Sequence, residues 1–283
     1  MRALRAAALA AALGLGLGSP AGALTVVASF QPLYDVLTRV AGPGVQVERM
    51  APAGSSPHTF DPTVRDIHRL REAALAVMAG LGADSWLDRY VRASGSRARV
   101  LKLGETMTFA KLRVGTATDP HWWLDASLMA QAALRMGADL AAVDPANADR
   151  YARNARREAQ ALNALHGDLR RTLAPVRGEK LVTFHNAFGY FARAYGLEVA
   201  ATIAPLHGVE PSVQSMVRAV QVIRATGARA VFSEPQLPPG PAGTVAREAG
   251  VPLYTLDPEG GPAAPTYPQM MRLNRDTLLR ALR

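Results

Sequence analysis

The sequence predicts an α/β fold of two lobes, each a roughly four-stranded parallel sheet with helices, joined by one long rigid helix. First, short β-branched runs alternate with amphipathic stretches in both halves of the chain. Second, this alternation stops between residues 127 and 173, where the sequence is helical throughout. Third, the strand-like runs are almost continuously apolar, which is typical of parallel strands buried on both faces.

The composition is that of a packed protein. Of the 283 residues, 49% are hydrophobic and 19% are charged, which excludes a disordered chain. Cysteine is absent, which excludes a disulfide scaffold, a thiolate zinc site, a cysteine nucleophile and lipidation on an N-terminal cysteine. The net charge of +9 comes from basic residues scattered along helical stretches, without a dense run. We therefore expect no nucleic-acid partner.

Residues 1–23 have the pattern of a secretory signal peptide. Arg2 and Arg5 form a positive region, and residues 6–18 are small and apolar. The sequence Ala21-Gly22-Ala23 is a small-residue cleavage site, so cleavage after Ala23 is expected. No later apolar stretch reaches about 18 residues, so we expect a periplasmic protein without stable membrane insertion.

The first lobe, residues 24–143, has four predicted strands with helices between them. The strands are expected at 25–30, 45–50, 75–79 and 100–103, and the helices at 32–40, 61–71 and 84–93. The first helix is ended by Gly42. The helix at 61–71 is expected to take Asp61 as its N-cap and Pro62 as its first residue.

The linking segment is predicted at residues 144–174. The helical stretch is interrupted at Asp144-Pro145, and apolar residues such as Tyr151, Leu162 and Leu169 then recur at helical spacing. A helix over 145–173 would be roughly 43 Å long, which is long for one small domain. We therefore expect it to connect two lobes.

The second lobe, residues 175–283, repeats the rhythm without a residue-level repeat. Its strands are expected at 180–184, 199–203, 230–233 and 253–256, and its helices at 187–195, 212–226, 242–249 and 267–282.

Candidate ligands for a metal stand at the carboxyl ends of predicted strands, where open α/β sheets bind ligands. His58 follows a strand of the first lobe, and His185 follows one of the second. Glu234 and Asp257 come directly after two further strands. Imidazoles and carboxylates that converge at a cleft form a ligand set for a divalent metal. Position alone leaves a packed or solvated role open for each histidine.

The other histidines differ in their surroundings. His121 stands in Asp119-Pro120-His121-Trp122-Trp123, where we expect the two tryptophans to pack and to position it. His207 lies in a loop flanked by Pro and Gly, near the expected cleft mouth or simply in the loop. His68 and His166 lie within helical stretches and are expected to be solvated or partly packed.

Five segments, in order along the chain, carry a family resemblance. They are Pro57-His58-Thr59-Phe60-Asp61-Pro62, Asp119-Pro120-His121-Trp122-Trp123, Phe184-His185-Asn186, Phe232-Ser233-Glu234-Pro235-Gln236 and Leu256-Asp257-Pro258. With them the sequence resembles the periplasmic solute-binding proteins of zinc and manganese ABC transporters. The resemblance implies two α/β lobes bridged by a helix, with the metal in the cleft between them. It implies His58, His121, His185 and Asp257 as ligands, with Glu234 as a cleft residue.

The resemblance implies a receptor that delivers metal to an inner-membrane ABC permease. Manganese members of the family commonly have Glu where His185 stands, and three imidazoles with one carboxylate suit Zn²⁺ better than Mn²⁺. Residues 107–119 contain no histidine, unlike the His-rich loop of many zinc importers. The expected function is a monomeric zinc receptor and not an enzyme.

Three alternatives stay open at this point. The first is a manganese receptor of the same family. The second is a periplasmic zinc hydrolase with Glu234 as its base, because three histidines and an open position activate water. The third is an adhesin or interaction module in which the metal stabilises the structure.

Overall fold

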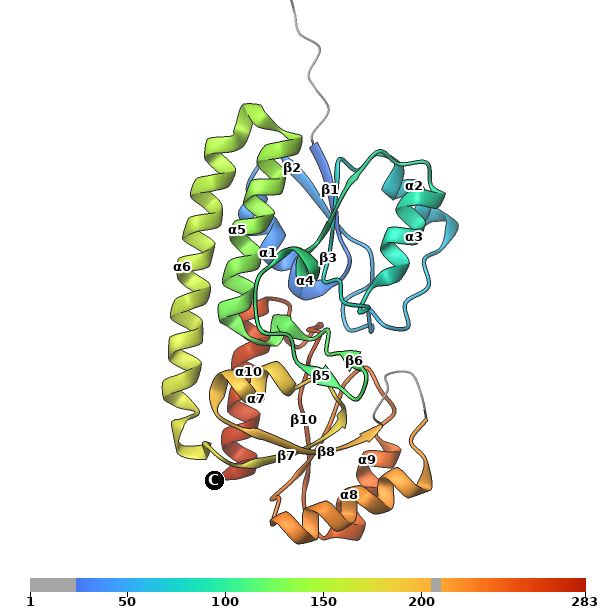
Figure 1. Cartoon of the computed structure of the whole chain (residues 1–283), viewed down its shortest axis with the longest axis vertical. Coiled ribbons are helices and arrows are strands. Elements are labelled where there is room, and N and C mark those ends of the chain that lie inside the picture. Colours follow the sequence, from blue (N-terminus) through green and yellow to red (C-terminus); the bar gives the residue numbers. More distant parts are fainter. Residues whose placement is uncertain (1–23, 205–209) are drawn as a thin grey trace, which may run out of the picture.

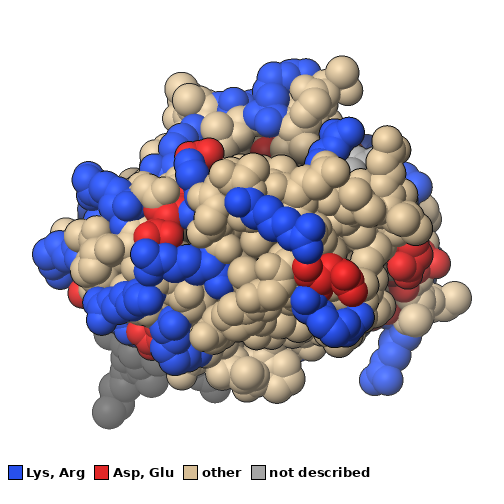
Figure 2. Space-filling model, turned by 90° about the horizontal axis from the view of Figure 1, so that it is seen from below, with Lys and Arg blue, Asp and Glu red and all other residues tan. Residues whose placement is uncertain are grey.

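A computed structural model describes residues 24–204 and 210–283, and shows two α/β lobes stacked along the long axis of the molecule (Figure 1). The predicted signal peptide and His207 lie outside the described residues. Among the helices of the described residues, none is long and apolar enough to cross a bilayer. On the face drawn in Figure 2, Lys and Arg side chains are interspersed with acidic and uncharged residues.

The first lobe contains a parallel sheet with the strand order β2-β1-β3-β4. Its central strands are buried, because their Val, Leu and Ala side chains are covered on both faces. The strands are β1 Leu24–Ala28, β2 Val45–Arg49, β3 Leu75–Met78 and β4 Arg99–Lys102, and the helices are α1 Gln31–Ala41, α2 Val64–Arg71, α3 Ser85–Ala93 and α4 Leu103–Thr106. This confirms the predicted four-stranded parallel sheet.

The second lobe repeats this topology. Its parallel sheet has the order β10-β9-β7-β8. In each lobe the first two strands of the chain pair with each other, the third pairs with the free side of the first, and the fourth pairs with the third. The strands are β7 Lys180–His185, β8 Glu198–Ala204, β9 Val231–Ser233 and β10 Leu253–Thr255, and the helices are α7 Gly189–Tyr195, α8 Val213–Thr226, α9 Gly240–Ala249 and α10 Tyr267–Leu282. The carboxyl end of β7 therefore delivers His185 to the side that faces the first lobe (Figure 1).

A long helix joins the two lobes, as predicted. Helix α5, Ala126–Val143, is followed by a short 3₁₀ turn, and α6, Ala148–Thr172, then runs beside α5 from the first lobe to the second (Figure 1). The 25 residues of α6 extend about 38 Å. The exact boundaries given above for the lobes and the linking segment stay predictions.

The lobes also share a hydrophobic core. Helix α10 contacts both α1 and α6, although it belongs to the end of the chain. One buried cluster consequently includes Val26 of β1, Leu165 of α6 and Leu278 of α10. A smaller second cluster lies between the sheet of the second lobe and helices α8 and α9. The shared core holds the facing sides of the lobes together around the interlobe region.

One local expectation is corrected. Helix α2 does not begin at Asp61-Pro62, because Thr63 is its N-cap and forms a reciprocal capping box with Asp66. The carboxylate of Asp61 instead accepts a hydrogen bond from the Tyr90 hydroxyl, 2.9 Å away. The segment before His121 contains the antiparallel pair β5 Arg113–Val114 and β6 Ala117–Thr118, for which the sequence predicted no element.

A buried carboxylate, Asp84, ties together the carboxyl ends of β1 and β3. Its Oδ2 accepts hydrogen bonds from the Ser29 hydroxyl at 2.5 Å and from the Ala79 amide at 2.6 Å. Its Oδ1 accepts from the Gly80 amide at 2.9 Å. Burial raises the pKa of Asp84 to about 6, although the three hydrogen bonds act in the opposite direction and lower this pKa.

We predict that Asp84→Ala destabilises the protein by about 3 kcal/mol or more, because three buried donors lose their acceptor and each costs about 1–3 kcal/mol. Urea unfolding measures the difference. Asp276→Ala is the control, since Asp276 is half-exposed and contacts only its neighbour Arg275 among the ion pairs of the described residues. Its loss should change stability by less than about 0.5 kcal/mol. Equal effects of the two substitutions would refute the role of Asp84.

Candidate metal centre

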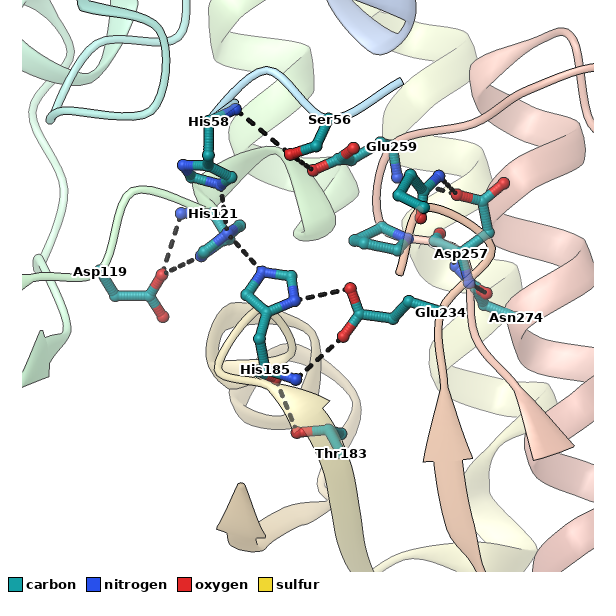
Figure 3. Close-up of polar contacts among 12 residues, drawn as sticks. Ser56, His58, Asp119, His121, Thr183, His185, Glu234, Asp257, Glu259 and Asn274 are labelled. Atoms are coloured by element: carbon teal, nitrogen blue, oxygen red, sulfur yellow. Dashed lines mark hydrogen bonds and ion pairs between the residues drawn. The ribbon is translucent and has the colours of Figure 1, made fainter. Parts of the chain in front are cut away.

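Three imidazoles from distant parts of the chain converge between the lobes (Figure 3). His58 lies in the loop after β2, His121 directly precedes the 3₁₀ turn Trp122–Leu124, and His185 is the last residue of β7. The Nε2 atom of His121 is 3.1 Å from that of His58 and 3.2 Å from that of His185. A tetrahedral zinc ion with bonds of about 2.0–2.1 Å holds its ligand atoms about 3.3 Å apart. The spacing of the three nitrogens therefore suits one metal ion.

Two carboxylates orient two of these rings. Glu234 Oε2 lies 2.6 Å from Nδ1 of His185, and its Oε1 accepts from the His185 backbone N–H at 3.0 Å. Asp119 Oδ1 lies 2.8 Å from Nδ1 of His121 and accepts from the backbone N–H of the same residue at 2.9 Å. A carboxylate beside Nδ1 favours the proton on that nitrogen, which leaves the lone pair of Nε2 for a metal.

The site is largely shielded from water. His121 and His185 are buried, at 4% and 2% exposure, and His58 is half-buried. Burial raises the pKa of Asp119 to about 7, while the backbone N–H of His121 lowers it. Gly189 leaves room for this carboxylate, since a Cβ there would lie 2.7 Å from Asp119 Oδ2 and something would have to shift.

The two tryptophans after His121 pack as expected and connect both lobes. Trp122 donates from Nε1 to the carbonyl of Ala79, at 3.0 Å, in the first lobe. Trp123 donates from Nε1 to the carbonyl of Pro258, at 2.8 Å, in the second lobe. Both side chains are fully buried, and the ring of Trp123 lies 5.1 Å from that of His121. The two hydrogen bonds fix His121 relative to both sheets.

Asp257, the fourth ligand implied by the resemblance, lies outside the group of three histidines that the described residues form. Its Oδ1 accepts three hydrogen bonds, from Gln236 Nε2 at 2.8 Å and from the amides of Glu259 at 3.0 Å and Gly260 at 2.9 Å. The side chain of Asn274 pairs with both backbone groups of Asp257. Asp257 thus organises the turn over 257–260, and its role as a ligand stays a prediction.

The remaining histidines are placed apart from the cluster. His68 is exposed on α2, and His166 on α6 lies 3.4 Å from a carboxylate oxygen of Asp125. Neither belongs to the group of ligand atoms found among the described residues.

Sequence reasoning assigned no role to two residues of the site. The partner of His121 is Asp119, two residues earlier, and this Asp-x-His spacing is a signal that was readable in the sequence. The second is Glu259, which is buried near Asp257 and Glu234 and accepts from the Ser56 hydroxyl at 3.2 Å. Burial, together with repulsion from Glu234 and Asp257, raises the pKa of Glu259 well above its usual range. Its position depends on tertiary packing, and no local pattern indicates it.

The chain is similar to known proteins along most of its length. Residues 26–281 match the ZnuA family, described as zinc-uptake complex component A, periplasmic. The manganese-binding lipoprotein MntA of Halalkalibacterium halodurans is 31% identical, over 92% of this chain and 88% of its own length. The iron-binding protein YfeA of Yersinia pestis is 29% identical, over 89% and 84%. A crystal structure of ZnuA superposes with a TM-score of 0.83 at 26% identity, and covers 92% of this chain and 100% of its own.

We predict that Glu234→Gln lowers metal affinity by about 10–100-fold, the usual cost of losing a partner of a metal-binding histidine. The two groups that face Glu234, the backbone N–H and Nδ1–H of His185, are both hydrogen-bond donors. The amide nitrogen of glutamine is also a donor, so it cannot accept a hydrogen bond from the one that it faces. Competition against a chromogenic chelator measures the affinity. Glu158→Gln is the matched control, because Glu158 is also buried but pairs with Arg39 on α1. Equal losses in both variants would show that the effect is not specific to His185.

Proposed function

Because the chain belongs to the ZnuA family of periplasmic zinc-uptake components, we propose that it is a receptor that binds Zn²⁺ and delivers it to the inner-membrane permease of an ABC importer. The observation that carries the proposal is the convergence of three Nε2 atoms with spacings of 3.1 and 3.2 Å. Two of the rings are oriented by carboxylates, as is usual for histidines that bind metal. The metal is the transported cargo.

Zinc is favoured by the donor set. Imidazole nitrogen suits Zn²⁺, whereas Mn²⁺ prefers carboxylate and other oxygen ligands. We propose His58, His121 and His185 as nitrogen ligands and retain Asp257 as the fourth ligand. The second candidate is a manganese receptor, which the 31% identity to a manganese-binding lipoprotein supports.

A zinc hydrolase is less well supported by the site. Glu234 is the candidate base for such an enzyme, but its two oxygens are engaged by Nδ1 and the backbone N–H of His185. A general base needs an oxygen that reaches the water it activates. We therefore propose a binding protein and not an enzyme.

Export and assembly complete the proposal. We propose that residues 1–23 are a signal peptide cleaved after Ala23. Strand β1 begins at Leu24, so this cleavage leaves the sheet intact. We further propose that the mature protein acts as a periplasmic monomer, with no nucleic-acid partner and no stable membrane insertion.

We predict that His58→Ala, His121→Ala and His185→Ala each lower zinc affinity by more than about 100-fold, since losing an outer partner alone costs about 10–100-fold. The wild-type chain should bind one tight zinc ion. Competition titration measures the affinity, and circular dichroism of the metal-free variants should show an unchanged fold. His68→Ala is the control, because His68 is exposed on α2. If this control loses zinc as strongly, the ligand assignment is wrong.

The same titration with Mn²⁺ separates the two candidate receptors. The zinc proposal predicts much weaker binding of manganese than of zinc. Equal or tighter binding of manganese would replace it with the second candidate. A chelator should remove zinc reversibly without unfolding the protein, whereas removal of a structural metal would unfold it.

We predict that the stabilisation by zinc depends on pH. An imidazole must lose its proton to bind metal, and histidine ordinarily titrates near pH 6.5. Protons therefore compete with zinc as the pH falls from about 7 to 5. Zinc at about 1,000 times its Kd adds roughly 4 kcal/mol to the folded state near neutral pH, which raises Tm by several degrees. Melting curves with and without zinc should converge near pH 5. A shift in Tm that stays constant over this range would contradict the three-histidine site.

A further inference from the structure

A segment of the first lobe crosses to the second lobe beside the histidines. Residues 109–119, which we call the strap, contain the antiparallel pair β5 and β6, which lies between the two lobes (Figure 1). The strap ends at Asp119, whose carboxylate contacts His121. A hydrogen bond from the Asp119 amide to the Leu112 carbonyl, at 2.9 Å, closes the strap at its base. The position of Asp119, and with it that of His121, therefore depends on where Leu112 is held.

Helix α7 of the second lobe holds the strap at Leu112 and Ala110. The hydroxyl of Tyr190 accepts a hydrogen bond from the Leu112 amide at 3.0 Å. The guanidinium of Arg193 donates to the Ala110 carbonyl at 2.8 Å, and it also lies over the Tyr190 ring, 4.8 Å from the ring centroid. The ring of Phe109 packs edge-on against Tyr190, with the centroids 5.9 Å apart. Tyr190 and Arg193, neighbours on one face of the helix, thus form a clasp on the strap.

The same helix begins next to another histidine of the proposed site. His185 is the last residue of β7, and α7 starts four residues later at Gly189. Asp119 lies against this glycine, where an added Cβ would be 2.7 Å from Oδ2. The clasp therefore joins the segment that carries His121 to the segment that carries His185. The Nε2 atoms of these two histidines are 3.2 Å apart.

The clasp is more exposed than the rest of the connection between the lobes. Most of residues 110–117 are exposed, and so is Arg193. By contrast, Trp122 and Trp123, which follow His121, are fully buried. Segments with few buried apolar contacts and with exposed hydrogen bonds open at a lower cost in free energy than a packed core does. The strap is therefore the part of this connection that separates most readily from the second lobe.

We propose that the clasp of Tyr190 and Arg193 holds His121 against His185 and thereby sets how fast the site releases its metal ion. This role rests on the proposed metal-binding function of the same site. Tyr190 and Arg193 are positioning residues, because they act on His121 through the strap. While the clasp is closed, the two imidazoles keep the spacing that suits one metal ion. When it opens, the strap carries His121 away from His185, and the ion loses a ligand.

Stopped-flow mixing with excess chelator measures the rate constant for dissociation of Zn²⁺ from the full mature chain. Tyr190→Phe removes the hydroxyl that accepts from Leu112 but keeps the aromatic ring. We expect its dissociation rate constant to rise about 2–10-fold, the effect of one hydrogen bond. Combining it with Arg193→Ala should raise the rate constant at least about 10-fold. Arg193→Lys keeps a donor and a positive charge, so it should release zinc more slowly than Arg193→Ala.

Tyr151→Phe is the matched control. The Tyr151 side chain is also fully buried, and its hydroxyl donates to Asp144 Oδ2 at 2.6 Å, at the end of α5 that is remote from His121. Its substitution should lower the stability of the metal-free protein but leave the dissociation rate constant of zinc unchanged. If Tyr190→Phe also lowers only Tm and leaves this rate constant unchanged, Tyr190 merely stabilises the fold and the proposal is wrong.

Arg193→Ala alone provides the test if Tyr190→Phe does not fold, because Arg193 is exposed and its loss leaves the core intact. A dissociation rate constant within about twofold of the wild-type value in this variant would overturn the proposal, since the lost hydrogen bond comes from a charged donor. A wild-type chain that binds no zinc would instead refute the proposed function, so the two failures are distinguishable.

Discussion

The structure depends on one constraint, which is that three imidazole nitrogens from three separate segments must be held about 3 Å apart. Such a cluster forms only if the loop with His58, the turn with His121 and the end of β7 are fixed relative to one another. Lone pairs that point at one spot repel unless a cation or a proton lies between them, so the surrounding protein must enforce the approach. Much of the interlobe architecture serves this purpose.

The enforcement comes from packing that crosses the lobes. Trp123 donates to Pro258, and the hydroxyl of Tyr267 on α10 donates back to the Trp123 carbonyl at 2.7 Å. The backbone N–H of Tyr267 also donates to Asp35 on α1 at 2.7 Å. The turn that carries His121 is therefore bound to helices from both ends of the chain. A linking helix alone would leave the lobes free to rotate, whereas the shared core restricts them at the site.

The acids around the site have separate tasks. Asp119 and Glu234 orient imidazoles, Asp257 accepts backbone amides of its own turn, and Glu259 contacts the loop of His58. Each carboxylate lies in a low-dielectric interior, where its energy depends strongly on its partners. Under the proposed function, the binding of a divalent cation at the histidines would be coupled to the carboxyl groups around them.

The sequence by itself determined the order of strands and helices, the repetition of one topology in two lobes and the positions of His58, His121 and His185. It did so because hydrophobic periodicity is local, and because the carboxyl ends of parallel strands place His58 and His185 at the edges of their sheets. His121 was indicated by the family resemblance of its segment. Only the tertiary structure decided the rest. Thr63 rather than Asp61 caps α2, because its capping box makes two reciprocal hydrogen bonds. Asp257 has its Oδ1 occupied by amides, while Glu259 retains a buried oxygen without a partner in the described chain. A carboxylate oxygen in this site can be paired with a group more than 200 residues away, as Glu259 is with Ser56. No local pattern in the sequence encodes such a contact.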